Sequence, residues 1–330
     1  AQEFPEVQFI SCTGDMAADS GLDNYHNAFA DIYQGRFIAG VAAGMKLNEM
    51  IESGKITADQ AKMGYVGAMP YAEVISGYTS FYLGAKYMCP TVTMDVIYTA
   101  SWYDETLEKE GAESLINGGA VLVSQHADSM GAPNACEAAG VPNVSYNGST
   151  QTACPNTYII SSRIDWTPYF TYAINAVLAG ENFDTNWTAG IDAGAVALTE
   201  LNETVAAPGT AEEIESVMKG LITDSVQVFD VSTFTVEGQT MAGYTADVDT
   251  QQKLPIIVRE LAEKETCEKR KGELIAMAEA CEHVPEYPAR SFQEALQAMS
   301  ILGIIMTFVV ANLDYRVILD RLSLFMLIFS

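Results

Sequence analysis

Short apolar runs and longer segments with helical spacing alternate along the middle of the chain. Five apolar runs have the length and the flanking turn residues of buried strands, at residues 63–67, 93–98, 120–124, 143–146 and 158–161. The segments between the first four runs, at 72–87, 103–117 and up to 139, carry apolar residues at helical spacing. Strands that alternate with helices of this length predict right-handed crossovers and a parallel α/β sheet.

The patterns on either side of this region are weaker. Residues 5–12 predict a strand, and residues 32–47 predict a helix in which Gly35, Gly40 and Gly44 allow close packing. Further strands are predicted at 189–199, 226–230 and 232–236, with helices at 169–179 and 211–220. From residue 254 onward the pattern is helical, with a charged helix over 254–280 and another from Ser291 to Leu302.

The third apolar run ends abruptly in a cluster of polar residues. The stretch AVLVSQHADS, residues 120–129, places His126 and Asp128 just beyond the carboxyl end of the predicted strand, beside Gln125 and Ser129. In open α/β sheets, ligands bind in the crevice outside the carboxyl ends of the strands, because the loops there are free of sheet pairing. The pattern therefore predicts a ligand site at this edge of the sheet.

Polar and aromatic residues also follow the other strands of this region. They lie in the loops 67–69, 102–104, 125–129 and 147–149, which a parallel sheet brings to one edge. A flat polar heterocycle would be held there by stacking on an aromatic ring and by hydrogen bonds to carboxylates and amides. The candidate ligand-binding residues are Met69, Trp102, Asp104, His126, Asp128 and Asn147.

Four of these residues also have a purely structural explanation. Trp102 could serve packing alone, and Asp104 could be the N-cap of the helix that follows it. His126 at a strand end could make a structural hydrogen bond instead of contacting a ligand. Asn147 with Gly148 is a pair typical of turns. For each of these residues both explanations stay open.

The net charge of −26 narrows the classes of partner. Nucleic-acid phosphates and anionic membrane surfaces would repel such a chain, so no nucleic acid is expected and the ligand is expected to be neutral or cationic. The acidity is uneven. Residues 251–330 carry nine Lys and Arg against eleven Asp and Glu, whereas the first 250 residues carry eight against 32. This shift predicts a domain boundary near Thr250.

Motifs for catalysis or metal binding are missing from the sequence. It has no GxSxG, GxxxxGK(S/T), GxGxxG or HExxH pattern, and its three histidines are scattered. We therefore predict no catalytic residue, no metal site and no cofactor. The six cysteines are expected to be buried thiols, with a Cys136 to Cys154 disulfide as the alternative in an oxidising compartment. The longest apolar run, residues 301–311, is too short to span a bilayer, which needs about 20 apolar residues.

Several motifs together resemble the basic membrane protein family of substrate-binding lipoproteins. They are YQGRFIAGVAAGMKL from residue 33, GYVGAM from 64, SWYDETLEKEGAESLINGGA from 101, SQHADS from 124 and VPNVSYNGS from 141. Members serve ABC importers, and characterised members bind purine nucleosides or related bases. The resemblance covers about residues 1–249. It implies a type I periplasmic-binding fold, in which two lobes built on parallel sheets hold a ligand between them and close around a hinge.

The resemblance also implies a division of the chain. Residues 1–62 would be a remnant of the first lobe, 63–160 the second lobe, and 161–249 return segments to both lobes. The family's lipid-anchoring cysteine and first βα units would precede Pro5, so we expect an incomplete first lobe and the absence of half of the cleft. The residues expected to face the cleft are Trp102, Asp104, His126 and Asp128.

The same resemblance implies a role outside the cytoplasm. The implied protein is not an enzyme. It binds a nucleoside or nucleobase-like small molecule and delivers it to the permease of an ABC transporter. It is extracytoplasmic, in the periplasm or at the cell surface, and it meets the membrane only through a lipid anchor that lies outside this chain.

Residues 250–330 resemble a different family. The segments RKGELIAMAEACEHVPEYPARSFQEALQAM from 270 and LDRLSLFMLIF from 319 are similar to an interior piece of a glycyl radical enzyme of the pyruvate formate-lyase type. Neither the active-site cysteine motif nor the glycine-radical loop of that family is present. The helical pattern from residue 254 onward predicts an all-helical C-terminal segment. The alternatives to a binding function are a fusion related to a radical enzyme and an inactive chimeric fragment that joins pieces of two genes.

Overall fold

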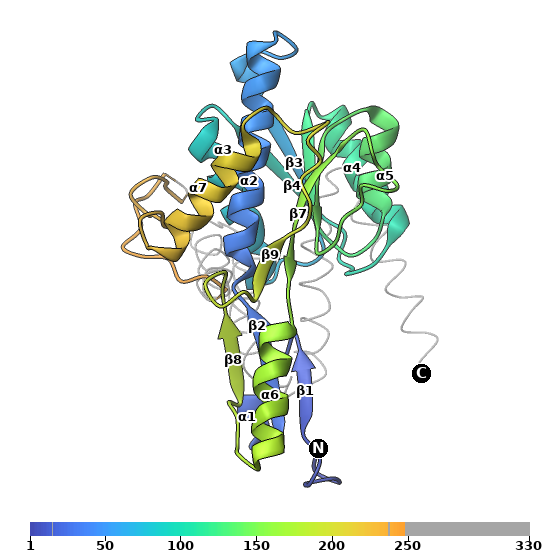
Figure 1. Cartoon of the computed structure of the whole chain (residues 1–330). Helices are drawn as coiled ribbons and strands as arrows, with labels where there is room; N and C mark the ends of the chain where they lie inside the picture. The colour runs from blue at the N-terminus through green and yellow to red at the C-terminus, as the bar shows by residue number, and fades with distance from the viewer. Residues whose placement is uncertain (15, 237, 248–330) are drawn as a thin grey trace, which may run out of the picture. The chain divides into compact units, whose positions relative to one another are not determined.

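Strands and helices alternate along the chain much as the apolar pattern predicts. The structure is a computed structural model that describes residues 1–14, 16–236 and 238–247 (Figure 1). Its strands are β1 (Phe9–Cys12), β2 (Tyr25–Ala30), β3 (Lys62–Gly67), β4 (Thr93–Tyr98), β5 (Leu122–His126), β6 (Asn143–Tyr146), β7 (Tyr158–Ile164), β8 (Asn186–Ala189) and β9 (Val196–Leu198). Its α-helices are α1 (Ala17–Ser20), α2 (Ile32–Glu52), α3 (Ala72–Met88), α4 (Glu105–Asn117), α5 (Gly131–Ala139), α6 (Thr167–Ala179) and α7 (Thr210–Ile222), and a 3₁₀ turn spans Ala58–Gln60.

The larger sheet has the strand order β4, β3, β5, β6, β7, β9. Neighbouring strands are parallel except β7 and β9, which confirms the predicted parallel sheet. Gly67 at the end of β3 lies opposite Tyr98 of β4 and His126 of β5, so the carboxyl ends of these strands are level. The strand order reverses at β3, and a crevice for ligands forms at such a switch point.

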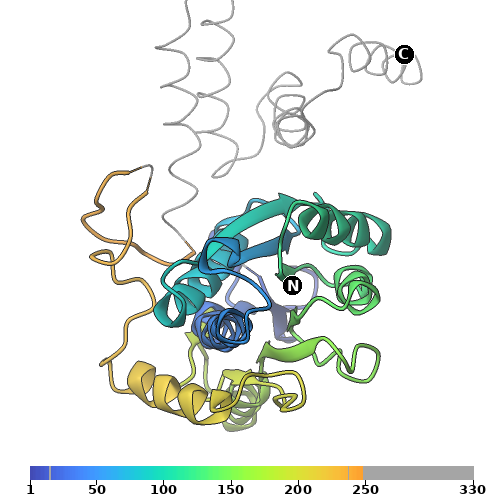
Figure 2. The same ribbon diagram turned by 90° about the horizontal axis from the view of Figure 1, so that it is seen from above.

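Helices cover both faces of this sheet (Figure 2). Met63 and Tyr65 of β3 pack into an apolar cluster with residues of α2 and α3. Val66 of the same strand and Val123 of β5 pack into a second cluster with residues of α4 and α5. Side chains alternate between the faces along a strand, so a strand buried on both faces needs apolar residues at successive positions. This is why β3 appears in the sequence as a nearly continuous apolar run.

Glycines allow α2 and α3 to lie very close together. A Cβ atom at Gly40 of α2 would lie 2.1 Å from the carbonyl oxygen of Phe81, and one at Gly84 of α3 would lie 2.0 Å from that of Phe37. The predicted packing role of Gly40 is therefore confirmed. Through this contact α2 packs with the larger sheet, although the division drawn from the sequence places all of residues 1–62 in the first lobe.

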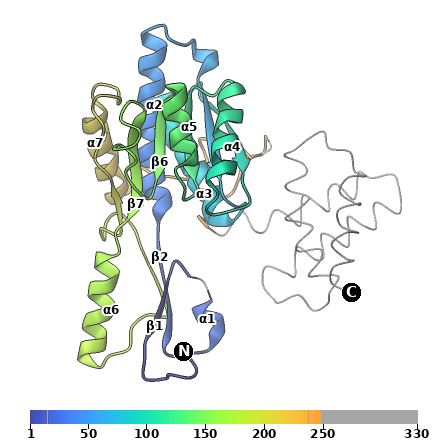
Figure 3. The same cartoon turned by 90° about the vertical axis from the view of Figure 1, so that its right-hand side faces the viewer.

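The smaller sheet consists of three parallel strands in the order β1, β2, β8 (Figure 3). The helix α6 packs on it, with Tyr169 and Ala173 buried against Ala28 of β2. Burial of these residues gives the smaller sheet a core of its own. Residues Ala1–Asp247 form one compact unit that contains both sheets.

Three chain segments connect the two sheets, between β2 and α2, between β7 and α6, and between β8 and β9. Backbone hydrogen bonds hold these segments to one another. The amide of Asp31 donates to Ala189 at 3.0 Å, and the amide of Asp165 donates to Ala195 at 2.8 Å. Two lobes built on parallel sheets are what the family resemblance implies.

Three strand predictions are wrong. The strand expected at 189–199 is replaced by β8 and β9, which belong to different sheets because a turn at 190–195 carries the chain between them. The described residues at 226–236 form turns, and Val236 makes only an isolated bridge with Gln239. Phe229 packs on the rings of Tyr33 and Tyr244. The apolar pattern there reflects packing against α2 rather than sheet pairing.

Some predictions concern cysteines, membrane segments and the C-terminal part. Cys136 and Cys154 are free, buried thiols, and burial raises the pKa of Cys136 to about 12. Within the described residues, no helix combines the length and the apolar character needed to cross a bilayer. The helices expected at 254–280 and 291–302 lie outside the described residues.

Candidate functional site

A cavity of about 380 Å³ lies at the carboxyl ends of β5 and β6, and residues of both lobes line it. Pockets for small molecules have volumes of about 300–1,000 Å³, so this cavity has room for one. We call it the cleft cavity. Its lining residues are Cys12, Thr13, Glu73, Trp102, Asp128, Tyr146, Asn147, Ile164 and Trp166.

A second hollow, of about 530 Å³, runs along α6. The residues that line it, between Trp166 and Asn175, all belong to this helix or its N-cap. A hollow beside one helix does not bring polar groups together from several directions, as small-molecule sites do. The cleft cavity does so, and it lies at the switch point of the larger sheet. We therefore take the cleft cavity as the candidate site.

Backbone and side-chain contacts fasten the two loops that carry Trp102 and Asp128. The amide of Asp128 donates to the carbonyl oxygen of Trp102 at 2.8 Å. The buried Glu108 of α4 accepts hydrogen bonds from the amides of Ser129 at 3.2 Å and Asp104 at 3.2 Å. Burial raises the pKa of Glu108, while these hydrogen bonds lower it in part. Trp102 and Asp128 are thus presented to the cleft cavity as one unit.

Three of the six residues predicted from the sequence line the cleft cavity, namely Trp102, Asp128 and Asn147. Met69 is half-buried beyond β3 and is not among the lining residues. Asp104 is the N-cap of α4, as the structural alternative predicts: its carboxylate accepts from the amides of Thr106 at 3.1 Å and Leu107 at 2.9 Å. His126 is completely buried behind the lining.

The N-cap contacts of Asp104 predict the effect of its removal. Asp104→Ala leaves two amides of the first turn of α4 without an acceptor, which costs about 1 kcal/mol of unfolding free energy. We expect Asp104→Ser, which retains a capping oxygen, to restore most of this loss. Urea titrations of both variants test the expectation. Equal destabilisation by both substitutions would contradict it.

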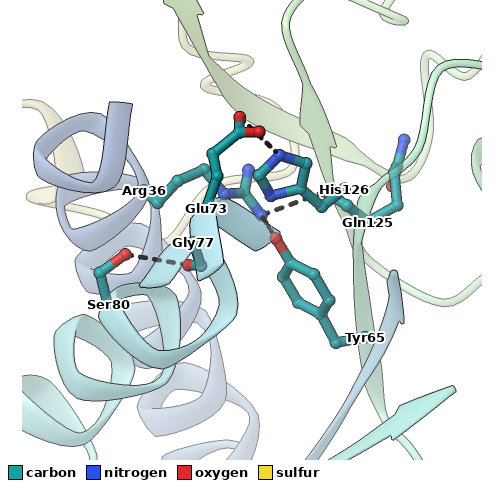
Figure 4. A network of polar contacts seen from close by, with 7 residues as sticks. All are labelled: Arg36, Tyr65, Glu73, Gly77, Ser80, Gln125 and His126. Atoms are coloured by element: carbon teal, nitrogen blue, oxygen red, sulfur yellow. Dashed lines mark hydrogen bonds and ion pairs between the residues drawn. The ribbon is translucent and has the colours of Figure 1, made fainter. Parts of the chain in front are cut away.

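His126 and Glu73 make a contact behind the cleft cavity (Figure 4). His126 ends β5, and its Nε2 lies 3.2 Å from the carboxylate of Glu73 in the first turn of α3. The ring of Tyr146 lies against the imidazole, with 4.2 Å between the centroids. Gly77 of α3 makes room for the imidazole, because a Cβ atom there would lie 2.6 Å from Nδ1.

Arg36 of α2 is a fully buried cation beside these residues. Its guanidinium donates to the side chains of Tyr65 at 2.9 Å and Ser124 at 2.7 Å, and to the carbonyl oxygens of Ser145 at 3.1 Å and Gln125 at 3.2 Å. None of these four partners is a carboxylate. Arg36 therefore cross-links β3, β5 and β6 just behind the cleft cavity through neutral acceptors.

The lining of the cleft cavity is acidic and aromatic. Its described residues include the carboxylates of Glu73 and Asp128 but no Lys, Arg or His. Partial burial raises the pKa of Asp128 and the charge of Glu73 raises it further, whereas a protonated His126 would lower it. Burial and both carboxylates raise the pKa of Tyr146 well above its ordinary value, so its hydroxyl stays neutral. Such a lining suits a flat ligand that presents N–H donors.

The sequence patterns did not select several residues that line the cleft cavity. Tyr146 is the last residue of a predicted strand, and Glu73 lies in the first turn after another, so both positions could have been found by extending the strand-end argument. Cys12, Thr13 and Trp166 come from the smaller sheet and from the N-cap of α6. No motif marks them, because their position depends on how the two lobes face each other.

Comparison with known families accounts for both parts of the chain. Residues 1–228 match the family profile Bmp, described as ABC transporter substrate-binding protein PnrA-like. The chain belongs to the Bmp family. This membership confirms the resemblance drawn from the sequence motifs. Residues 246–330 of the Bmp chain match a profile described as pyruvate formate lyase-like, which confirms the change of resemblance near Thr250.

Individual relatives of the Bmp chain include two curated proteins. A purine-binding protein of Brucella abortus is 31% identical over 180 residues, which are 54% of this chain and 47% of the relative. A proposed ABC transporter glucose-binding protein of Haloferax volcanii is 27% identical over 241 residues, which are 73% of this chain and 57% of the relative. The chain thus spans about half the length of these relatives.

A solved structure supports the fold. The crystal structure of an ABC transporter solute-binding protein from Aeropyrum pernix K1 superposes on the Bmp chain with a TM-score of 0.58 at 17% identity. The superposition covers 84% of this chain and 78% of that one. At this level of identity the likeness concerns the fold alone, and it agrees with two lobes built on parallel sheets.

Proposed function

We propose that this Bmp chain is the solute-binding component of an ABC importer and holds a purine nucleobase or nucleoside in the cleft cavity. It acts outside the cytoplasm and delivers its ligand to a membrane permease. Membership of the Bmp family supports the transport role. The proposal assigns the chain a binding function and no catalysis.

The lining of the cleft cavity is the observation that carries the choice of ligand. Three aromatic side chains, from Trp102, Tyr146 and Trp166, converge there with the acceptors of Glu73 and Asp128. Purine rings stack on aromatic faces and carry N–H donors along their edges. A sugar is the competing ligand, because one relative is named for glucose binding whereas another is named for purine binding. Three aromatic rings and few neutral polar side chains in the lining favour a purine base over a sugar as the ligand.

Calorimetric titration of the full chain with adenine, guanosine, hypoxanthine and D-glucose tests this proposal. We expect heat with at least one purine and none with glucose. A saturating purine, at about 100 times its Kd, should stabilise the fold by about 2.7 kcal/mol and raise the Tm. Heat with glucose alone would mean that the chain binds a sugar and not a purine. Absence of heat with all four compounds would refute the proposal.

Trp102→Ala tests the stacking contact directly. Base stacking on an aromatic side chain contributes about 1–3 kcal/mol, so we expect a loss of purine affinity of roughly 5- to 150-fold. Tyr103→Ala is the matched control, because Tyr103 is the neighbouring aromatic residue, is 67% exposed and does not line the cleft cavity. Equal purine affinity in both variants would exclude stacking on Trp102.

A further inference from the structure

Glu73 contributes a carboxylate to the lining of the cleft cavity, and a contact with His126 behind the lining holds this carboxylate in place. It lines the cavity, its side chain is 18% exposed, and its Oε1 lies 3.2 Å from Nε2 of His126. Its position in the first turn of α3 places it directly after β3, where the strand order of the larger sheet reverses. Glu73 therefore reaches the crevice at which ligands bind in such sheets.

The surroundings of His126 determine which ring nitrogen carries the proton. Nδ1 is buried, has no hydrogen-bond partner in the part of the chain that the structure describes, and faces Gly77, where a Cβ atom would lie at only 2.6 Å. A proton on Nδ1 would be a buried donor without an acceptor, and such donors are rare in folded proteins. The proton therefore lies on Nε2, and the neutral imidazole donates it to Oε1 of Glu73. This bond orients the carboxylate and leaves its negative charge uncompensated.

Among the described residues, nothing else in the lining of the cleft cavity compensates that charge. None of the described lining residues is a lysine or an arginine, and Arg36 gives its hydrogen bonds to Tyr65, Ser124 and two carbonyl oxygens. The second carboxylate, Asp128, is close enough for the charge of Glu73 to raise its pKa. Two carboxylates at a partly dehydrated site repel each other, and donors of the ligand would relieve this repulsion.

We propose that Glu73, oriented by His126, is the specificity-determining residue of the cleft cavity and selects bases that carry an exocyclic amino group. The inference rests on the proposed function and names the ligand class within it. An amino group donates an N–H to the carboxylate. A methyl group of similar size cannot donate, so the carboxylate would be dehydrated without a hydrogen-bond partner. This lowers the affinity for the base about ten- to hundred-fold. His126 is a positioning residue, because it acts through Glu73.

Adenine and 6-methylpurine are the probes, because they differ only in an amino group against a methyl group of similar size. Calorimetry on the full chain measures the ratio of their affinities. We expect at least a tenfold preference for adenine in the unaltered chain and less than threefold in Glu73→Gln, which keeps the side-chain size but removes the charge. Glu105→Gln is the matched control, since Glu105 is exposed in the first turn of α4 and does not line the cavity.

Two substitutions of His126 separate positioning from packing. His126→Gln retains an N–H donor near the position of Nε2, whereas His126→Met fills a similar volume without a donor. We expect the preference for adenine to persist in His126→Gln and to fall below threefold in His126→Met. A merely structural role would lower the Tm of both variants and leave the affinity ratio unchanged.

The outcomes distinguish this inference from the proposed function. Equal affinity of the unaltered chain for the two purines, or a preference in Glu73→Gln that stays above tenfold, would overturn the role of Glu73 and leave purine binding intact. An unchanged preference in His126→Met would overturn the role of His126. Absence of heat with every purine would refute the proposed function and this inference with it.

Discussion

Arg36→Met is expected to lower the free energy of unfolding by about 3 kcal/mol. The four groups that accept hydrogen bonds from Arg36, on β3, β5 and β6, lose their donor, and each bond to a charged donor contributes about 1.5–3 kcal/mol. The gain from no longer burying a charge offsets part of this loss. The loss prevails because the guanidinium also lies against the rings of Tyr65, Phe81 and Tyr146, at 5.2–5.9 Å from their centroids.

Thermal and urea unfolding measure this effect. For a domain of this size, about 3 kcal/mol corresponds to a fall in Tm of roughly 6–12 °C. Arg163→Met is the control, because the Arg163 side chain is 40% exposed and its ion pair with Asp165, at 3.2 Å, contributes less than about 1 kcal/mol. Arg36→Met and the control could instead have the same Tm. The free energy lost in burying the charge of Arg36 would then equal the free energy gained from its hydrogen bonds.

Gly84→Ala is expected to destabilise the fold by about 2 kcal/mol. The added methyl group would lie 2.0 Å from the carbonyl oxygen of Phe37 and 3.1 Å from the amide of Val41, both of which belong to the backbone of α2. Backbone atoms cannot rotate away as a side chain can, so α2 and α3 must separate, and overpacking of this kind costs about 1–3 kcal/mol or more. The better helix propensity of alanine returns at most about 1 kcal/mol.

Gly148→Ala is the control for this substitution, because no atom lies within 4 Å of a Cβ placed there. We expect it to change the free energy of unfolding by less than about 0.5 kcal/mol. Gly40→Ala should behave like Gly84→Ala, since its Cβ would lie 2.1 Å from the carbonyl oxygen of Phe81. If Gly84→Ala or Gly40→Ala were as stable as the control, α2 and α3 would be able to move apart with no loss of unfolding free energy.

The larger sheet could be predicted from the sequence because its inner strands β3, β5 and β6 are almost entirely buried. Met63 and Val66 of β3 face opposite layers, so β3 has no charged residue after Lys62 and stands out as an apolar run. The same argument failed for β2, whose sequence YHNAFA mixes polar and apolar positions. His26 and Asn27 are buried there through hydrogen bonds to Asp184 and Asn186, which no local pattern reveals.

The candidate site could be predicted only as far as it follows strand ends. Trp102, Asp128 and Asn147 lie in the loops that follow β4, β5 and β6, and parallel pairing brings these loops to one edge. Arg36 lies within the motif that begins at Tyr33, but its partners lie far away along the chain, so the sequence does not show which groups it contacts. Likewise, Glu73 gains its place from a histidine 53 residues further along. The apolar pattern of a sequence indicates where strands end, but it does not indicate which side chains of different strands and helices contact one another.

The fastening of the Trp102 and Asp128 loops has a thermodynamic consequence for ligand recognition. Because Glu108 and the backbone bond between Trp102 and Asp128 already fix these loops, a ligand loses little of its binding energy in ordering them. Cys12 and Thr13, on the other side of the cleft cavity, are exposed. For the ligand proposed here, the cost of ordering the site would therefore fall mainly on the side of Cys12 and Thr13.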